Sequence, residues 1–378
     1  METPHTSPHP HVPSAPAVAG ERVGVRAIHC LAAALLLLLL TGCGPGAVMP
    51  TPPPAVAPIV PGTATPARAA LAAPPPTAVA EGAALPGRLL FVKNGDLWVW
   101  EGENGVALTS SGDAFQPAWS PDGARIAYIR RTESYSDLLV MPAAGGEPAQ
   151  LTGDGSNAPP HSYERILDSV WAFYPAWSPD GAEIAFTSQA APPAGEPAAE
   201  YRLTLYAVPS SGGEKQQIYA DDGAHVGRPV YTPDGAAIVF ANQPTGTGVP
   251  QLYRYTRASS SAAPLAGAPD QSYDPAFSSD GRWLAFAARD GGRTDVFAMP
   301  VGGGAPVRLT NLGGARAPAF SPDGKLLAFL AITPGSNSFD LWIADLQIGA
   351  DGALHALQPR QLTHDMRLDA DSGLSWAR

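Results

Sequence analysis

The sequence predicts an all-β protein in which repeats of four short antiparallel strands close into a ring. The chain of 378 residues contains 42 prolines and 40 glycines, and only 15% of its residues are charged. This composition favours short strands and turns over long helices. The segment "PAWSPDG" at 117–123 recurs at 175–181, and it returns in altered form as "PVYTPDG", "PAFSSDG" and "PAFSPDG". Recurring segments of this kind indicate a fold built from repeated structural units.

Residues 1–42 are expected to be an export signal. An apolar core from Leu31 to Leu40 follows Arg22 and Arg26, and it is shorter than the roughly 20 residues of a membrane-spanning helix. Leu40-Thr41-Gly42-Cys43 resembles the lipobox of bacterial lipoprotein signals. That resemblance implies that Cys43 carries a lipid and becomes the first residue of the mature chain. An ordinary cleaved signal and an uncleaved anchor are the alternatives.

Residues 43–86 are expected to form a disordered tether, because they are rich in proline and alanine and contain no aromatic residue. Cys30 and Cys43 are the only cysteines, so we expect no disulfide in the folded part. The formal net charge of −11 argues against nucleic acid as a partner and against adhesion to anionic lipid through basic patches.

The folded part is expected to span residues 87–378. The aspartates of the repeated motif are separated by 58, 54, 46 and 43 residues, and they are Asp122, Asp180, Asp234, Asp280 and Asp323. An apolar run such as "RIAYI" follows each motif, and its two faces are both apolar, which predicts a strand covered on both sides. A third strand ("DLLVMP") and a fourth ("QLT") complete each repeat. Four antiparallel strands form one blade of a β-propeller.

Counting the aromatic residues of the repeats gives the number of blades. The first-strand aromatics are Trp119, Trp177, Tyr231, Phe277, Phe320 and Trp376. The second-strand aromatics are Phe91, Tyr128, Phe186, Phe240, Phe286 and Phe329. Both counts are six, but residues 87–109 supply only a second, third and fourth strand, whereas "SGLSWAR" at the C-terminus supplies only a first. We therefore predict a six-bladed propeller whose C-terminal strand joins the N-terminal blade and removes the open sheet edge.

The aspartates of the motif are expected to be turn residues. In Ser120-Pro121-Asp122-Gly123 the proline presets φ, and the glycine accepts the left-handed conformation, as a tight turn between two strands requires. Five carboxylates spread around a ring are also too far apart to share one substrate. We therefore predict a structural role for these aspartates.

The motif Trp-Ser-Pro-Asp-Gly, followed by Ile-Ala-Phe and preceded by a closing Leu-Thr, resembles the repeats of TolB-type β-propellers across residues 87–378. TolB itself is a soluble periplasmic protein that carries an α/β domain ahead of its propeller and binds a peptidoglycan-associated lipoprotein. Here the lipidated tether replaces that leading domain, so the resemblance implies the fold and not a place in the Tol assembly. Similar repeats precede prolyl-oligopeptidase-type hydrolases, but the chain contains no Gly-x-Ser-x-Gly, and we expect no hydrolase domain to follow.

A binding site is expected on the face opposite the Asp-Gly turns, where the long segments 152–174, 188–202 and 364–373 fall. The positions just before each first strand vary between repeats, which suggests that the fold does not constrain them. The candidate partner-binding residues are Gln116, Trp171, Tyr174, His225, Arg228, Tyr273, Asp274 and Arg316. We predict no metal site and no cofactor, because the loop histidines lack ligand spacing and "DADSG" at 369–373 reads better as a turn than as a calcium loop.

These features predict a lipoprotein anchored to the cell membrane or outer membrane and facing the periplasm or exterior, with a monomeric propeller that binds a protein, a peptide or an envelope glycan without catalysis. Two alternatives stay open: an enzyme of lyase or glycosidase type, and a small-ligand sensor, each with its site at the channel mouth. Acidic, histidine or arginine side chains converging in the pore would favour the enzyme.

Overall fold

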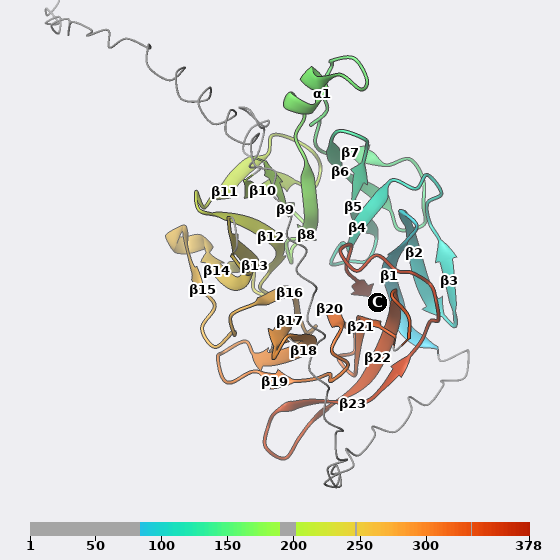
Figure 1. Ribbon diagram of the computed structural model, residues 1–378, viewed down its shortest axis with the longest axis vertical. Coiled ribbons are helices and arrows are strands. Elements are labelled where there is room, and N and C mark those ends of the chain that lie inside the picture. The colour runs from blue at the N-terminus through green and yellow to red at the C-terminus, as the bar shows by residue number, and fades with distance from the viewer. Residues whose placement is uncertain (1–83, 190–201, 246–247, 334) are drawn as a thin grey trace, which may run out of the picture. The chain divides into compact units, whose positions relative to one another are not determined.

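The computed structural model describes residues 84–378 except for 190–201, 246–247 and 334. It is all-β, with six four-stranded antiparallel sheets arranged as the blades of a ring (Figure 1). The fold predicted from the sequence is therefore confirmed. The signal, Cys43 and residues 43–83 of the tether lie outside the described residues. Within the described part, no helix has the length and apolar character needed to cross a membrane.

Each blade contains an inner, second, third and outer strand. The inner strands are β24 (Ser375–Ala377), β4 (Ala114–Trp119), β8 (Ala172–Trp177), β12 (Ala224–Tyr231), β16 (Ser272–Phe277) and β20 (Ala315–Phe320). The second strands are β1 (Leu85–Lys93), β5 (Arg125–Arg131), β9 (Glu183–Gln189), β13 (Ala237–Pro244), β17 (Trp283–Asp290) and β21 (Leu326–Ile332). The third strands are β2 (Asp96–Gly102), β6 (Ser136–Pro142), β10 (Leu203–Pro209), β14 (Gln251–Thr256), β18 (Arg293–Pro300) and β22 (Phe339–Ile348). The outer strands are β3 (Asn104–Ala107), β7 (Ala149–Gln150), β11 (Gln216–Tyr219), β15 (Ser261–Pro264), β19 (Val307–Arg308) and β23 (Leu354–Gln361). A short helix, α1 (Tyr163–Leu167), and a 3-10 turn, η1 (Arg257–Ser259), complete the described elements.

The ring closes as the sequence predicts. β24 pairs antiparallel with β1, and Trp376 lies opposite Leu89 in that pairing. The Trp376 indole also donates a hydrogen bond of 2.8 Å to the Pro86 carbonyl. β1 begins at Leu85, two residues before the expected start of the repeat. The first and last described strands therefore share one blade.

The hydrophobic core is divided into six clusters, and each cluster lies between two neighbouring blades. The aromatics of the second strands are at most 5% exposed. In five blades this aromatic pairs across the sheet with an aromatic of the third strand, for example Phe329 with Trp342 at a centroid distance of 6.4 Å. Burying one such side chain stabilises the fold by roughly 2–3 kcal/mol. Neighbouring blades therefore provide the cover that the apolar second strands require.

A buried aspartate at the start of the third strand fixes the chain between blades. Asp340 is fully buried, and it accepts hydrogen bonds from the Thr363 hydroxyl at 3.0 Å and from the Met366 amide at 3.0 Å. Asp295 is held in the same way by Thr310. The closing Leu-Thr of the repeat thus has a physical role, since its hydroxyl anchors the segment that leads to the next inner strand.

The Asp-Gly motifs form the turns from inner to second strand. In the first motif the Gly123 amide donates to the Ser120 carbonyl at 2.8 Å, and Gly123 has φ of 68°. Asp122 Oδ1 accepts from the Ser120 hydroxyl at 2.6 Å and from the Ala124 amide at 3.0 Å. The same hydroxyl-to-carboxylate bond recurs in the other four motifs. The structural role predicted for these aspartates is confirmed.

Antiparallel pairing puts the two kinds of connection on opposite faces of the ring. Turns from inner to second strand and from third to outer strand share one face, which we call the short-turn face. The connections between blades and those from second to third strand share the other, which we call the long-loop face. Inner strands start at the long-loop face, so their first residues surround one mouth of the central channel.

Candidate binding site at the channel mouth

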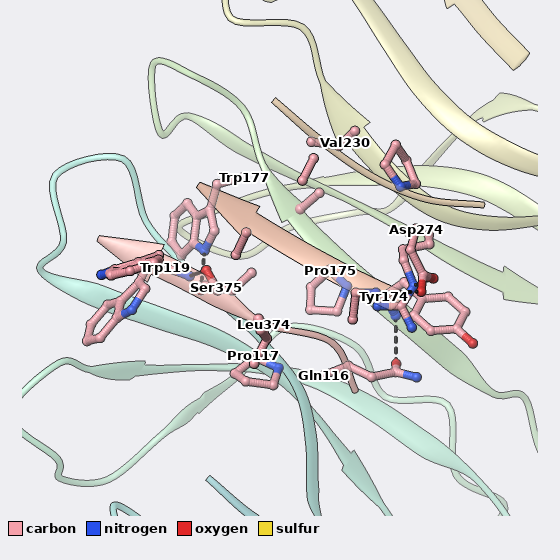
Figure 2. A pocket seen from close by; sticks show the side chains of 18 of the residues that line it. Gln116, Pro117, Trp119, Tyr174, Pro175, Trp177, Val230, Asp274, Leu374 and Ser375 are labelled. Atoms are coloured by element: carbon pink, nitrogen blue, oxygen red, sulfur yellow. Dashed lines mark hydrogen bonds and ion pairs between the residues drawn. The ribbon is translucent and has the colours of Figure 1, made fainter. Parts of the chain in front are cut away.

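The six inner strands enclose a cavity of about 300 Å³ along the axis of the ring (Figure 2). Prolines such as Pro117 and Pro175 and small residues such as Ala276 line its middle. Trp119, Trp177 and other first-strand aromatics line it toward the short-turn face. The polar side chains lie mainly at the long-loop mouth, where Gln116, Tyr174 and Asp274 gather (Figure 2). The charged side chains that line the channel therefore stand at one end of it.

The variable mouth positions lie within the inner strands, and not just before them as the sequence suggested. In five blades the inner strand contains a β-bulge. Two residues of the inner strand there lie opposite a single residue of the second strand, its buried aromatic. The first residue of each bulge has positive φ: Gln116 53°, Tyr174 53°, Arg228 43°, Asp274 54° and Ala317 54°. The matching position ahead of β24 is Gly373, with φ of 73°. Left-handed conformations cost non-glycine residues roughly 1–3 kcal/mol each, so the packed blades must impose the bulge.

Two arginines converge on the buried carboxylate of Asp274. Arg228 Nε lies 2.8 Å from Asp274 Oδ1, and Arg316 Nε donates to Asp274 Oδ2 at 2.9 Å. Arg316 Nη2 lies 3.3 Å from Oδ1, and the Ala317 amide donates to Oδ2 at 3.2 Å. Asp274 is only 3% exposed. Both of its oxygens are therefore occupied by donors from the two neighbouring blades.

The charges of this cluster stabilise one another. Burial alone would raise the pKa of Asp274, but the Arg228 and Arg316 guanidiniums outweigh it and hold that pKa below its ordinary value. Burial alone would lower the pKa of Arg316, but the carboxylates of Asp274 and Asp371 raise it above its ordinary value. Asp274 and Arg316 therefore both stay ionised at neutral pH.

Asp371 extends the cluster across the mouth. It lies in the segment leading to β24, and its carboxylate accepts from Arg316 Nη1 at 2.7 Å. Its backbone carbonyl accepts from Arg228 Nη2 at 2.6 Å. Arg228 belongs to β12, whose blade stands opposite the β24 blade in a ring of six. The contact therefore bridges the mouth from one side to the other.

Aromatic rings flank the two arginines. The Arg228 guanidinium lies 4.9 Å from the Tyr174 ring centre, and the Arg316 guanidinium lies 5.3 Å from that of Tyr273. Tyr174 continues a row of rings outward through Phe173 to Trp171, with centroid distances of 5.9 and 6.2 Å. The Tyr174 amide donates to Gln116 Oε1 at 2.8 Å, as Figure 2 shows. Such faces favour contact with both cations and apolar groups.

The structure brings together six of the eight candidate residues: Gln116, Tyr174, Arg228, Tyr273, Asp274 and Arg316. Trp171 joins them only through the row of rings. His225 does not join the cluster; its Nδ1 accepts a hydrogen bond of 3.4 Å from the Leu203 amide of β10. Sequence reasoning missed Asp371, because nothing local to "DADSG" indicates that two arginines from other blades reach it.

The segment "DADSG" forms a turn, as predicted. Asp369 Oδ1 accepts from the Asp371 amide at 2.9 Å, and Asp369 Oδ2 accepts from the Ser372 hydroxyl at 3.0 Å. Within the described residues, no three acidic, histidine or cysteine side chains gather as a metal site would need.

Comparison with known proteins supports a TolB-type propeller. Residues 173–357 match the family model of the TolB beta propeller domain. The crystal structure of TolB from Acinetobacter baumannii superposes with a TM-score of 0.55 at 23% identity, covering 73% of this chain and 66% of that one. A putative TolB from Agrobacterium tumefaciens superposes with a TM-score of 0.51 at 19% identity, covering 73% of this chain and 88% of that one.

A curated relative extends the likeness to a longer protein. The uncharacterized peptidase YuxL of Bacillus subtilis (strain 168) is 26% identical over 221 residues, which are 48% of this chain. The match spans only 30% of that peptidase's length. The likeness therefore concerns a part of that protein, and its activity does not follow for this chain.

Proposed function

We propose that this protein is a non-catalytic binding scaffold that recognises a protein or peptide of the cell envelope through the long-loop mouth of its channel. The observation that carries the proposal is the mouth cluster, in which charged side chains from four blades converge beside two tyrosine rings. Tyr174, Arg228 and Asp274 stand on the bulges of their inner strands, which hold them in fixed positions at the mouth. A glycan ligand, or a small ligand held by a sensor, would meet the same surface.

We propose further that the chain is exported and held at a membrane by a lipid on Cys43. The support is the apolar core and the lipobox-like ending of residues 1–43, together with the likeness of the propeller to TolB. The lipid would fix the location, the tether of residues 43–86 would set the reach, and the ring would present the mouth rigidly.

Catalysis at the same mouth is the second candidate, because the convergence of acidic and arginine side chains expected of an enzyme is present. Binding is favoured by the state of Asp274. A general base needs a free lone pair and a pKa near the working pH. The pKa of Asp274 lies below its ordinary value, and donors occupy both of its oxygens. Release of unsaturated or reducing ends from acidic polysaccharides by the full-length protein, lost in Asp274→Asn while circular dichroism shows that the variant is folded, would establish the enzyme instead.

The binding proposal is tested with immobilised full-length protein and solubilised bacterial envelope. The double variant Tyr174→Ala/Tyr273→Ala removes both rings of the mouth, and it should lose the proteins that the wild type retains. The matched control Arg282→Ala/Lys325→Ala alters exposed residues of the short-turn face, and it should retain them. Equal retention by both double variants, or no specific retention by the wild type, would refute a mouth-centred scaffold.

A further inference from the structure

Asp274 orients the side chains of Arg228 and Arg316 toward the same part of the channel mouth. Each guanidinium places its Nε against this buried carboxylate. Each then points a terminal nitrogen at the same residue, Asp371. The side chains of Arg228 and Arg316 are 18% and 22% exposed, so little freedom is left to them. Asp274 therefore orients a pair of donors toward one point at the entrance.

The charges at this point show what the pair would bind. Arg228, Arg316 and Asp274 together carry one net positive charge, which Asp371 balances. The Asp371 side chain is 72% exposed, in contrast to the 3% exposure of Asp274. An exposed ion pair contributes about 0–1 kcal/mol, so a competing carboxylate of similar strength can displace it. Arginine donors arranged side by side are suited to carboxylates, which they bind with two or more hydrogen bonds.

We propose that the mouth is a carboxylate-binding site for an acidic peptide segment of the partner, and that Asp371 occupies this site as an internal competitor. This inference rests on the proposed function and names the chemistry of the ligand. The peptide carboxylate takes the position of the Asp371 side chain at Arg316 Nη1, and no covalent bond changes. Tyr174 and Tyr273 on either side accept the carbon chain that carries the carboxylate. A peptide is favoured over a uronic-acid glycan because tyrosine and arginine side chains, which gather at this entrance, contribute much of the binding energy in protein interfaces.

The competition has a directional consequence. Removing the charge of Asp371 takes the competing carboxylate away from Arg316 Nη1 without touching Asp274, so affinity for an acidic peptide should rise. A residue that merely supports the fold would not increase affinity on removal.

The test measures binding of fluorescein-labelled hexaglutamate and hexaglutamine to the full-length protein by fluorescence anisotropy at low and physiological salt. Asp371→Asn should bind hexaglutamate at least about tenfold more tightly than the wild type, with weaker binding as salt rises. Neither protein should bind hexaglutamine. Adding Arg316→Gln to Asp371→Asn should abolish the gain in affinity. Adding the matched control Arg289→Gln to Asp371→Asn should leave the gain intact, because Arg289 is an exposed arginine elsewhere on the long-loop face.

Three results would overturn the inference: no gain in Asp371→Asn and in a second variant, Asp371→Ser; equal binding of hexaglutamine; or a gain for oligogalacturonate without one for hexaglutamate. If envelope proteins still depend on Tyr174 and Tyr273 while hexaglutamate shows no gain, the scaffold proposal stands and this inference alone fails. If the envelope experiment fails but Asp371→Asn still binds hexaglutamate tenfold more tightly, the carboxylate site stands and the scaffold proposal fails.

Discussion

At the scale of single residues, Asp274 decides the character of the channel mouth. It is the buried member of the cluster, and two guanidiniums depend on it for their charge balance and their direction. Breaking a buried ion pair by removing one partner is costly because the remaining charge stays in a poorly hydrated site. Asp371 has the same side chain but lies largely in water, so its contribution to stability is small.

Asp274→Asn should lower the free energy of unfolding by about 3–5 kcal/mol, because Arg228 and Arg316 lose the carboxylate that balances them. The matched control Asp371→Asn should change it by no more than about 1 kcal/mol. Urea unfolding at neutral pH, followed by tryptophan fluorescence, measures both values. Similar losses in the two variants would show that burial does not set the importance of these aspartates.

Acid should reduce the difference in unfolding free energy between the wild type and Asp274→Asn. The pKa of Asp274 is lower in the folded protein than its ordinary value of 3.8. The carboxylate therefore contributes stability above pH 3.8, and this contribution is lost as the pH falls through the lowered folded-state pKa. The difference in unfolding free energy between wild type and Asp274→Asn should be constant from about pH 7 to pH 5 and should shrink below about pH 4. A difference that grows on acidification would contradict the assignment.

A turn aspartate offers a direct check of its structural role. The Ser178 hydroxyl is the largest of the groups that lower the pKa of Asp180, followed by the Ala182 amide. Ser178→Ala should raise the pKa of Asp180 toward 3.8, while Asp234 in the next blade keeps its lowered pKa. Carboxyl carbon chemical shifts followed by NMR through an acid titration report both groups in one sample. An unchanged Asp180 would show that the hydroxyl does not hold the carboxylate.

At the scale of elements, the bulge of the inner strand places the mouth side chains. It recurs in five blades with first residues as different as Gln116, Asp274 and Ala317, and in each of them the second residue is proline, which cannot donate to the strand ladder. The two bulge residues lie opposite one buried aromatic of the second strand. The proline of the repeat is a signal for a bulge, but only Gly373 among the six first positions carries the usual signal for positive φ.

Gly373→Ala tests how closely the mouth is packed. Both Gly373 and Gly352 have positive φ, of 73° and 76°, so alanine at either position should cost about 1–2 kcal/mol of unfolding free energy. A Cβ on Gly373 would also lie 2.4 Å from Arg228 Nη1, whereas a Cβ on Gly352 meets nothing within 4 Å. Gly373→Ala should therefore destabilise the protein clearly more than the control Gly352→Ala. Equal losses in thermal unfolding would show that Arg228 moves aside freely.

At the scale of the whole molecule, the sequence predicts the ring far better than the site. The spacing of Trp119, Trp177 and Trp376 and the apolar runs after each motif give the strand order, the blade count and the closure, because every blade must satisfy the same packing. The contact of Arg228 and Arg316 with Asp371 depends on how opposite blades approach one another at the axis. No repeat encodes that approach, so the candidate residues could be named in advance but their joint target could not.

Ring closure depends on a short pairing, and this makes the last strand a test of the architecture. β24 contributes three residues to the sheet, and Trp376 supplies both a packed ring and the hydrogen bond to Pro86. Truncation after Leu374 should leave the edge of β1 unpaired and lower the free energy of unfolding by about 3 kcal/mol, because it removes a large, partly buried side chain together with the pairing of β24 with β1.

The same truncation should also make the protein self-associate, since an exposed strand edge pairs with other chains. Size-exclusion chromatography with light scattering and urea unfolding measure the two effects, and truncation after Ala377 is the control that removes only Arg378. A monomer of wild-type stability after loss of β24 would mean that the interfaces between blades hold the ring without its closing strand.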